Sequence, residues 1–212
     1  MQETQKKLYI TADLHISNEK LLNIACRPFS SIQAWRQHLI ANINKYVSED
    51  SILIINGDIQ AESREDWLEF RNALNCQEIW MILGNHDGSD MYRDTVAVLD
   101  SKLIITYETN DRDYVIHIDH YPQAFWFRSH YGSLHMYGHC HAQREAFLNK
   151  ALPGRRSQDI GVDMAYIIYG EYRPFDLDIL CSELQMRPGH HDLAVEREWE
   201  AEHKHRMDNL IA

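Results

Sequence analysis

Three short apolar runs in the first half of the chain each end in a turn that carries Asp, Asn or His. The runs cover residues 8–12, 52–56 and 79–83, and each is a continuous hydrophobic stretch, which is typical of strands buried on both faces. The segments between them have helical periodicity. This alternation predicts a layered α/β arrangement in which the strand ends carry the polar groups.

Two helices are predicted between these strands. The first is expected to begin after Ser30, because Gln33 follows three residues later as in a capping box, and the second is expected to begin after Ser63. We expect both apolar stripes to pack on the sheet. The stripes consist of Ile32, Trp35, Leu39, Ile43 and Tyr46 in the first helix and of Trp67, Phe70 and Leu74 in the second.

The second half of the chain reads as a succession of strands with few helices, which predicts a second, more antiparallel sheet. The segment 147–159 is predicted to be a loop, and Pro188-Gly189 is predicted to break the chain before a charged helix. We therefore expect a main domain over residues 1–185 and a helical appendage over 186–212. The strands are predicted at 103–107, 114–118, 134–137, 161–165 and 175–180.

The charge balance and the cysteines narrow the class of protein. The chain has 32 Asp and Glu against 21 Lys and Arg, a net charge of −11, which disfavours binding along nucleic acid backbones. Its four cysteines form no CxxC pair, which fits a reducing compartment. Since there is no signal peptide and no apolar run of membrane-spanning length, we expect a soluble cytoplasmic protein. Nothing in the sequence indicates an oligomeric state.

Side chains that can ligate metals or transfer protons follow five of the predicted strands. Because residues two apart share one side of an extended chain, Asp13 is predicted to lie beside His15, and His139 beside His141. Nitrogen and oxygen donors without a thiolate suit divalent ions such as Mn, Fe, Zn or Ni. The motifs are Asp13-Leu14-His15, Gly57-Asp58, Gly84-Asn85-His86-Asp87, His120 and Gly138-His139-Cys140-His141.

Taken in this order, the five motifs resemble the signature of the calcineurin-like metallophosphoesterases, from about residue 8 to about residue 180. The resemblance implies an α+β or α/β fold, a four-layer αββα sandwich of two mixed β-sheets flanked by helices. Further short stretches resemble a small bacterial and phage-type branch of that family. They are Arg27-Pro28-Phe29, His120-Tyr121-Pro122, Ser133-Leu134-His135-Met136-Tyr137 and Asp159-Ile160-Gly161-Val162-Asp163.

The resemblance also implies a catalytic centre with two divalent metal ions, Mn²⁺ in the first place and Fe, Zn, Ni or Mg as alternatives. It implies that Asp58 bridges the ions and that a hydroxide between them attacks phosphorus. His86 is implied as the acid that protonates the leaving oxygen, with Asp87 orienting its ring. By the same motifs, one ion is bound by Asp13, His15 and His141 and the other by Asn85, His120 and His139.

Two positions depart from the pattern of this branch. Ser17-Asn18 stands where many relatives have a Gly-His pair, and an Asn side chain cannot donate a proton as a protonated His does. Ile59-Gln60-Ala61 follows Asp58 in place of the usual acidic and basic residues. This change is expected to alter the groups that support the metal ligands rather than the ligands.

An aromatic-rich segment over residues 121–131 lies between two of the motifs. One interpretation is that it lines the substrate pocket, with Arg128 holding a phosphate bidentately and His130 nearby. The other is that its rings pack in the core or in an oligomer contact. His117 and His135 are expected to be structural.

Three functions are compatible with these residues. The first is a metal-dependent phosphodiesterase or phosphatase that acts on a small nucleotide-like substrate. The second is a non-catalytic metal-binding scaffold, which is disfavoured because all seven ligand positions and His86 are present. The third is a nuclease acting on DNA or RNA, which the negative charge disfavours because Arg155-Arg156 is the only compact basic pair between the motifs.

Overall fold

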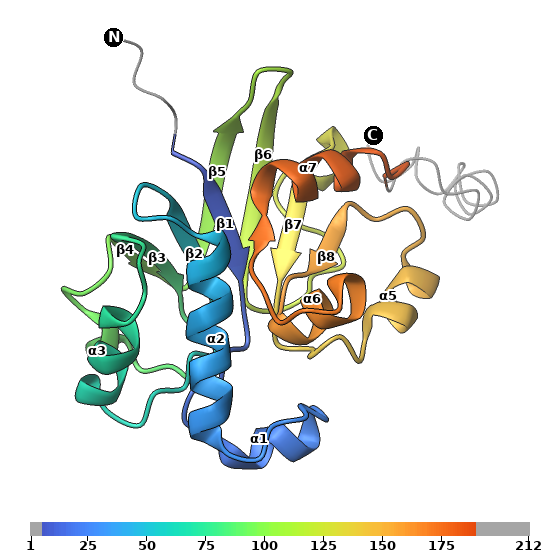
Figure 1. Ribbon diagram of the computed structural model, residues 1–212. Helices are drawn as coiled ribbons and strands as arrows, with labels where there is room; N and C mark the ends of the chain where they lie inside the picture. Colours follow the sequence, from blue (N-terminus) through green and yellow to red (C-terminus); the bar gives the residue numbers. More distant parts are fainter. Residues whose placement is uncertain (1–5, 190–212) are drawn as a thin grey trace, which may run out of the picture.

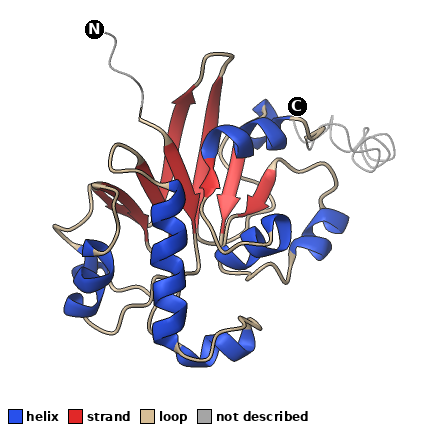
Figure 2. Ribbon diagram, in the orientation of Figure 1, coloured by secondary structure: helices blue, strands red, loops and turns tan. Residues whose placement is uncertain are grey.

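The computed structural model describes residues 6–189 and contains two mixed β-sheets that pack on each other, with helices around them (Figure 1; Figure 2). This arrangement confirms the predicted two-sheet sandwich. The predicted appendage after residue 189 lies outside the described residues. Among the described helices, none combines the length and apolar composition that crossing a bilayer requires.

The first sheet has the strand order β4-β3-β2-β1-β9. Strands β1 to β4 are parallel, and β9 pairs antiparallel with β1. The strand bounds are Leu8–Thr11 (β1), Ile52–Asn56 (β2), Glu78–Ile82 (β3), Val98–Asp100 (β4) and Phe175–Asp176 (β9).

The second sheet has the order β5-β6-β7-β8. Strands β5 and β6 form an antiparallel hairpin that projects from the top of the molecule in Figure 1, whereas β6, β7 and β8 are parallel. The expected antiparallel pairing in the second sheet is therefore found only in the hairpin. The bounds are Lys102–Glu108 (β5), Asp113–Asp119 (β6), Leu134–Tyr137 (β7) and Ser157–Asp159 (β8).

The helices of the described residues connect strands along the chain and lie around the two sheets (Figure 2). Helix α2 begins after Ser31, whose side chain accepts a hydrogen bond from the backbone N–H of Ala34, so the cap predicted at Ser30 is wrong by one residue. The predicted cap of α3 at Ser63 is confirmed. The bounds are Glu19–Ile24 (α1), Ile32–Tyr46 (α2), Arg64–Asn72 (α3), Ser89–Tyr92 (α4), Ser129–Tyr131 (η1, a 3-10 helix), Glu145–Ala151 (α5), Val162–Tyr169 (α6) and Leu177–Gln185 (α7).

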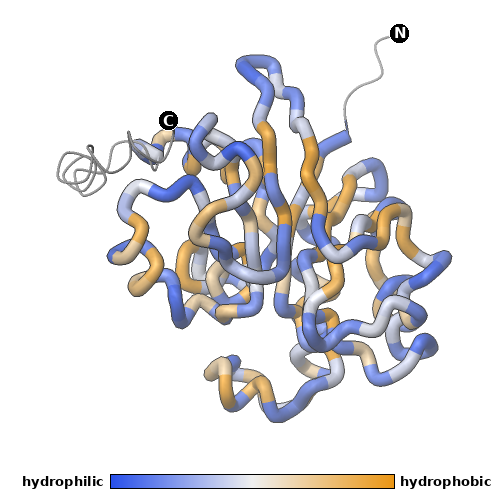
Figure 3. Tube along the Cα trace, turned by 180° about the vertical axis from the view of Figure 1, so that it is seen from behind, coloured by the Kyte–Doolittle hydropathy of each residue, from blue (hydrophilic) through white to orange (hydrophobic). Residues whose placement is uncertain are grey.

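Side chains alternate along the strands of the first sheet and so divide the interior into two cores. Leu53 packs with Trp35 of α2, whereas its neighbour Ile54 packs with Ile116 and Met136 of the second sheet. Figure 3 shows the hydrophobic residues gathered along the central strands and the hydrophilic ones mainly in the outer loops. The sheet-to-sheet core holds the strand ends of both sheets in one place.

Three predictions for the second half of the chain are wrong. Residues 161–165 belong to α6 and not to a strand, and most of 175–180 belongs to α7. The apolar runs there are too short for periodicity to separate helix from strand. The segment 147–159 is not a loop, because it contains most of α5 and all of β8.

Candidate metal centre

The ends of β1, β2, β6 and β7 meet at one edge of the two sheets, and the loops there are joined by backbone hydrogen bonds. The N–H of Asp13 donates to the carbonyl of Gly57 at 3.0 Å, and that of His15 donates to the carbonyl of Asp58 at 2.9 Å. The N–H of Gly138 donates to the carbonyl of His120 at 3.0 Å, which ties the second sheet's loops together. The two sets of loops are joined by the N–H of His139, which donates to Oδ1 of Asp13 at 2.9 Å, so four of the five motifs form one cluster.

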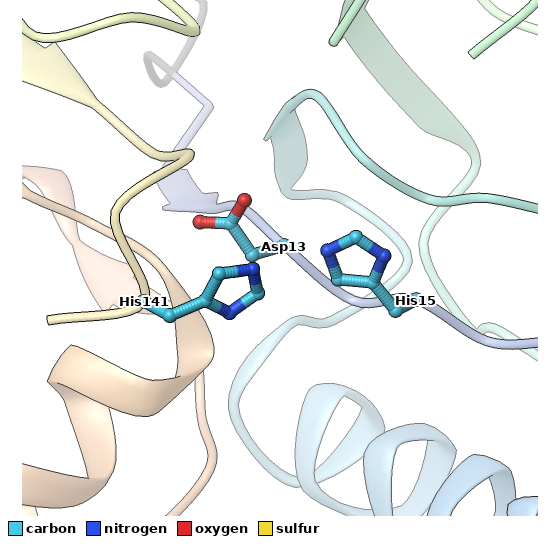
Figure 4. Close-up of side chains that lie close together, drawn as sticks. All are labelled: Asp13, His15 and His141. Carbon is cyan, nitrogen blue, oxygen red and sulfur yellow. The ribbon is translucent and has the colours of Figure 1, made fainter. Parts of the chain in front are cut away.

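Six of the predicted ligands form two groups. In each group the donor atoms lie within 4.8 Å of one another. Figure 4 shows one group, with Asp13 and His15 on the segment after β1 and His141 on the loop after β7. The groups are Asp13, His15 and His141, and Asp58, His120 and His139.

The side chains of Asp13 and His15 do not come together in the way that the sequence predicted. Both residues have positive φ, +59° and +46°, so the chain is not extended there. His139 and His141 have φ of +68° and +46° and repeat the feature. Non-glycine residues in this left-handed region carry strain that is concentrated at functional sites. The pairs are therefore set by a strained loop that the bonds between loops hold in place.

The Asp58 carboxylate lies between the two groups. Its Oδ2 is 3.6 Å from Nε2 of His15 and 3.3 Å from Nε2 of His120. Its Oδ1 accepts a hydrogen bond from the backbone N–H of His86 at 3.0 Å. One carboxylate oxygen thus faces a ligand atom of each group, as a residue that bridges two cations must.

Two buried nitrogen atoms at this place show that the residues fit metal ions. Nε2 of His15 and Nε2 of His120 are buried and have no hydrogen-bond partner among the described residues. The Nδ1–H of His15 donates to Gln60 Oε1 at 2.5 Å, and that of His120 donates to the carbonyl of Asn56 at 2.8 Å. Since a neutral imidazole that donates through Nδ1 has its lone pair on Nε2, both orphaned atoms are suited to bind a cation.

His141 is positioned by a buried ion pair. Its Nδ1 lies 2.7 Å from Oδ2 of Asp163, and Arg27 donates to both carboxylate oxygens of Asp163 at 2.8 Å. Arg27 also donates to the backbone carbonyls of Asp13 at 2.7 Å and Leu14 at 3.2 Å. Arg27 therefore links the loop after β1 to the residue that orients His141.

Burial and charge shift the pKa values of these groups in opposite directions. Burial raises the pKa of Asp13 to about 6 and lowers that of His15 to about 3. Burial also opposes the charged forms of Asp58 and His120, but their mutual contact holds the pKa of Asp58 at about 2 and raises that of His120 to about 9. Without a metal, a protonated His120 thus neutralises Asp58, and a cation bound there takes the place of that proton.

The remaining residues of the loop after β3 have different surroundings. Asn85 is exposed, and its Oδ1 lies 2.9 Å from Nδ1 of His139. The exposed His86 ring lies edge-on to the His15 ring, with 5.4 Å between their centroids. Both side chains border the two groups of candidate ligands.

Asp87 does not orient the His86 ring as the resemblance implied. Its carboxylate accepts hydrogen bonds from the backbone N–H groups of Asp58 (2.6 Å), Gly84 (3.0 Å) and Gln60 (3.0 Å) and from the Tyr92 hydroxyl (2.8 Å). Asp87 therefore fixes the loops after β2 and β3 against each other and positions Asp58.

Gly84 permits this close approach of the two loops. A Cβ atom at residue 84 would lie 2.2 Å from Oδ1 of Asp58 and 2.6 Å from its backbone nitrogen. Since no other residue lacks a Cβ, only glycine leaves the Asp58 carboxylate in its present place.

Arg128 and His130 lie away from the candidate ligands. Because β6 and β7 are parallel, the segment between them must return to the opposite end of the sheet, and Arg128 accepts a hydrogen bond there from the N–H of Ser133, just before β7. His130 follows in η1 and is exposed. This placement contradicts the expectation that these two side chains contact a substrate at the metal-binding edge.

Part of the aromatic-rich segment packs in the core, as the second interpretation expected. Trp126 is buried and packs on His135, with 5.3 Å between ring centroids, whereas Phe125 and Phe127 are exposed. His117 and His135 are buried between this segment and β6 and β7, in agreement with a structural role.

Sequence reasoning did not assign the three side chains that support the ligands, namely Arg27, Gln60 and Asp163. Signals for all three were present, since Arg27 and Asp163 lie in stretches that resemble the bacterial and phage-type branch and Gln60 departs from it. What the sequence lacked was the pairing, because Arg27 and Asp163 are 136 positions apart.

Two known proteins resemble the chain in sequence or in fold. Over 186 residues the chain is 26% identical to an uncharacterized protein of Methanocaldococcus jannaschii, a match that covers 84% of this chain and 90% of that protein. A protein of unknown function from Aquifex aeolicus has a similar fold, with a TM-score of 0.64 and 16% identity over 84% of this chain and all of that one.

A family model covers more of the chain than either relative. The model of the calcineurin-like phosphoesterases matches residues 6–206, a range that contains every candidate ligand described above. With its two groups of candidate metal ligands at the shared edge of two sheets, the chain belongs to the calcineurin-like phosphoesterases.

Proposed function

We propose that this protein hydrolyses a small phosphodiester or phosphomonoester with the help of two divalent cations held by the two groups of side chains. The observation that carries the proposal is the position of Asp58, whose Oδ2 faces the orphaned Nε2 atoms of His15 and His120. Asn85 completes the proposed set beside His139. When bound, a pair of cations lowers the pKa of a water molecule and offsets the charge of the phosphoryl oxygens.

The protein's own side chains would orient the reaction. The imidazoles of His15 and His120 are fixed by acceptors at Nδ1, so their Nε2 atoms face the centre without rotation of either ring. His86 is exposed at the border of the centre, where it can donate a proton to the leaving oxygen of a substrate. We assign His86 the role of general acid and Asp87 that of a positioning residue.

We propose a small substrate because the chain has a large negative net charge. A net charge of −11 repels a long polyanion, whereas a compact ester needs only the local positive charge of the metal centre. We propose Mn²⁺ as the native metal, since nitrogen and oxygen donors without a thiolate suit it. All four cysteines are free thiols, which supports the proposed cytoplasmic location.

Hydrolysis of two chromogenic esters tests the proposal. With Mn²⁺, the wild-type protein is expected to hydrolyse bis-p-nitrophenyl phosphate, p-nitrophenyl phosphate or both. Asp58→Asn is expected to abolish turnover, and His86→Gln to lower kcat by about 10²–10⁴-fold. His130→Gln, an exposed histidine at the other end of the sheet, is the matched control and should retain full activity.

Three results would contradict the proposal. The first is no turnover of either ester with Mn²⁺, Fe²⁺, Zn²⁺, Ni²⁺ or Mg²⁺, which would favour a scaffold. The second is unchanged turnover in Asp58→Asn. The third is a much higher kcat/KM for DNA or RNA oligonucleotides than for small esters, which would favour a nuclease.

A further inference from the structure

Three arginine side chains line a pocket at the end of the second sheet that is opposite to the candidate metal centre. The pocket has a volume of about 270 Å³. Arg112 comes from the turn between β5 and β6, Arg128 from the segment between β6 and β7, and Arg156 from the residue before β8. Since β6 to β8 are parallel and the candidate ligands follow β6 and β7, the length of the sheet separates this arginine pocket from the metal centre.

A single carboxylate stands against the three positive charges that line the arginine pocket. Within residues 6–189, none of the three guanidinium groups forms an ion pair, although Arg27, Arg36 and Arg155 each pair with an Asp or Glu. Asp113 is the one acidic side chain that lines the pocket, and it forms no ion pair within the same range. Three like charges that line one pocket repel one another, and an anion bound among them relieves this repulsion.

Arg156 is held in place through its Nε–H group. Its Nε–H donates to the carbonyl of Arg187 at 2.9 Å, which fixes the plane of the guanidinium group. A Cβ atom at residue 132 would lie 2.7 Å from Nη1 of Arg156, and Gly132 has a φ of +87°. Only glycine therefore allows the backbone this turn and the guanidinium group this position.

Arg128 has a similar local restraint. It has a φ of +59°, which is uncommon for a residue with a side chain, and its guanidinium carbon lies 5.8 Å from the centre of the Tyr131 ring. A strained backbone and a ring contact thus keep the side chain at the pocket. By contrast, the neighbouring Arg155 is buried and paired with Glu145, so it contributes no free charge.

We propose that the arginine pocket binds a phosphate group, either inorganic phosphate or the phosphate of a small ester. Guanidinium groups present paired N–H donors that match phosphate oxygens. Three guanidinium groups against one carboxylate leave a charge that suits a dianion better than a carboxylate ligand. The volume lies near the lower end of small-molecule sites, which limits the ligand to a small molecule. The proposal is independent of the proposed hydrolytic activity.

NMR of the full chain loaded with Mg²⁺, which is diamagnetic, tests the proposal site by site. The arginine Nε–Hε signals of ¹⁵N-labelled protein are followed during titration with inorganic phosphate and, separately, with AMP. Saturable shifts are expected for Arg112, Arg128 and Arg156. Equal affinity for both ligands identifies free phosphate as sufficient, whereas tighter binding of AMP identifies an ester, and either result supports the pocket.

Two variants provide the quantitative test. Arg156→Gln is expected to weaken phosphate binding at the arginine pocket by about tenfold or more, because it removes charge-assisted hydrogen bonds. It should leave ester hydrolysis unchanged. Lys150→Gln removes the same charge from an exposed position on α5 and should change the affinity by less than about twofold.

Three outcomes would overturn the proposal. One is the absence of saturable shifts at these arginines with phosphate and with AMP, and another is an equal effect of Arg156→Gln and Lys150→Gln. The third concerns the acidic residues that follow Gly189, which itself lies beside Arg156. If phosphate shifts the signals only in full-length protein carrying Glu196→Gln, Glu198→Gln, Glu200→Gln and Glu202→Gln, the occupant is the chain's own C-terminal segment.

Discussion

Replacing Arg27 with Met should damage both the stability of the protein and its affinity for metal ions. Arg27 is buried and donates hydrogen bonds to Asp163, to the carbonyl of Asp13 and to that of Leu14. Burial alone would raise the pKa of Asp163, but the hydrogen bonds from Arg27 and His141 hold it at about 2. Met has a similar shape without the charge, so the variant leaves Asp163 buried beside a single partner.

The size of both effects follows from these contacts. Breaking a buried ion pair from one side costs about 3–5 kcal/mol of unfolding free energy, a large part of the roughly 5–15 kcal/mol of a typical domain. A residue that orients a metal-binding histidine contributes about 10–100-fold to metal affinity. We therefore expect Arg27→Met to unfold at lower urea concentration and to bind Mn²⁺ about 10–100-fold more weakly.

Arg155→Met is the matched control for this prediction. Arg155 is equally buried and pairs with Glu145 at 2.6 Å, but it contacts none of the candidate ligands. Urea unfolding of metal-free protein and calorimetric titration with Mn²⁺ measure the two effects separately. If both variants lose stability and Arg27→Met binds Mn²⁺ no more weakly than Arg155→Met, the proposed link from Arg27 through Asp163 to His141 is refuted. Arg27→Lys, which keeps the charge, covers the case in which the Met variant does not fold.

Three further predictions address the centre, the core and the metal. Gly84→Ala places a Cβ 2.2 Å from Oδ1 of Asp58 and should weaken Mn²⁺ binding by about tenfold or more in a calorimetric titration; Gly88→Ala, with nothing within 4 Å, should have no effect. Burial lowers the pKa of His135 to about 4, so the unfolded chain binds more protons below its ordinary pKa of about 6.5, and stability must fall as the pH drops. From pH 7 to pH 5, His135 is expected to lower the unfolding free energy measured with urea by about 2 kcal/mol. If the pH dependence of the unfolding free energy is the same in His135→Gln, His135 is not its source. Mn²⁺ at about 100 times its Kd should add about 2.7 kcal/mol to the unfolding free energy in thermal scans, and an equal gain in Asp58→Asn would show that the ion binds elsewhere.

The sequence predicted the three inner strands of the first sheet, β1, β2 and β3, well because their runs are long enough and mostly apolar. The run 52–56 was located to the residue, and β1 and β3 to within one residue. The second half was harder to predict because its helices are short and its edge strand is polar. In β8 the side chains Ser157, Gln158 and Asp159 are buried through tertiary hydrogen bonds, such as that from Arg187 to Gln158 at 2.6 Å, and no periodicity reveals this.

The metal centre could be predicted in composition but not in geometry. The motifs contain six candidate ligands that the structure brings together in two groups, yet the extended backbone assumed for Asp13 and His15 is wrong. Their left-handed conformation depends on hydrogen bonds to Gly57 and Asp58, which lie on another strand end. The local sequence does not reveal a backbone conformation that depends on contacts with residues far away in the chain.

The groups that accept hydrogen bonds from the candidate ligand histidines differ from one another. A carboxylate, Asp163, stands behind His141, whereas a side-chain amide stands behind His15 and a peptide carbonyl behind His120. A carboxylate makes an imidazole a stronger donor than a neutral acceptor does. Arg27 also pairs with Asp163, and this lowers the extent to which the carboxylate strengthens His141 as a metal ligand. The two groups of ligands therefore differ less in donor strength than their partners alone would suggest.

An acidic chain repels an anionic substrate, and the candidate ligand set explains how the proposed substrate can still bind. Of the seven candidate ligands, only Asp13 and Asp58 carry negative charge, and the other side chains are neutral when they bind metal. Two divalent cations with two carboxylates leave a centre with a formal charge of about +2. The negative charge of −11 is spread over the chain, whereas this positive charge is concentrated at one edge of the sheets. A small phosphoester can reach such a centre without approaching the rest of the surface, and a long nucleic acid cannot.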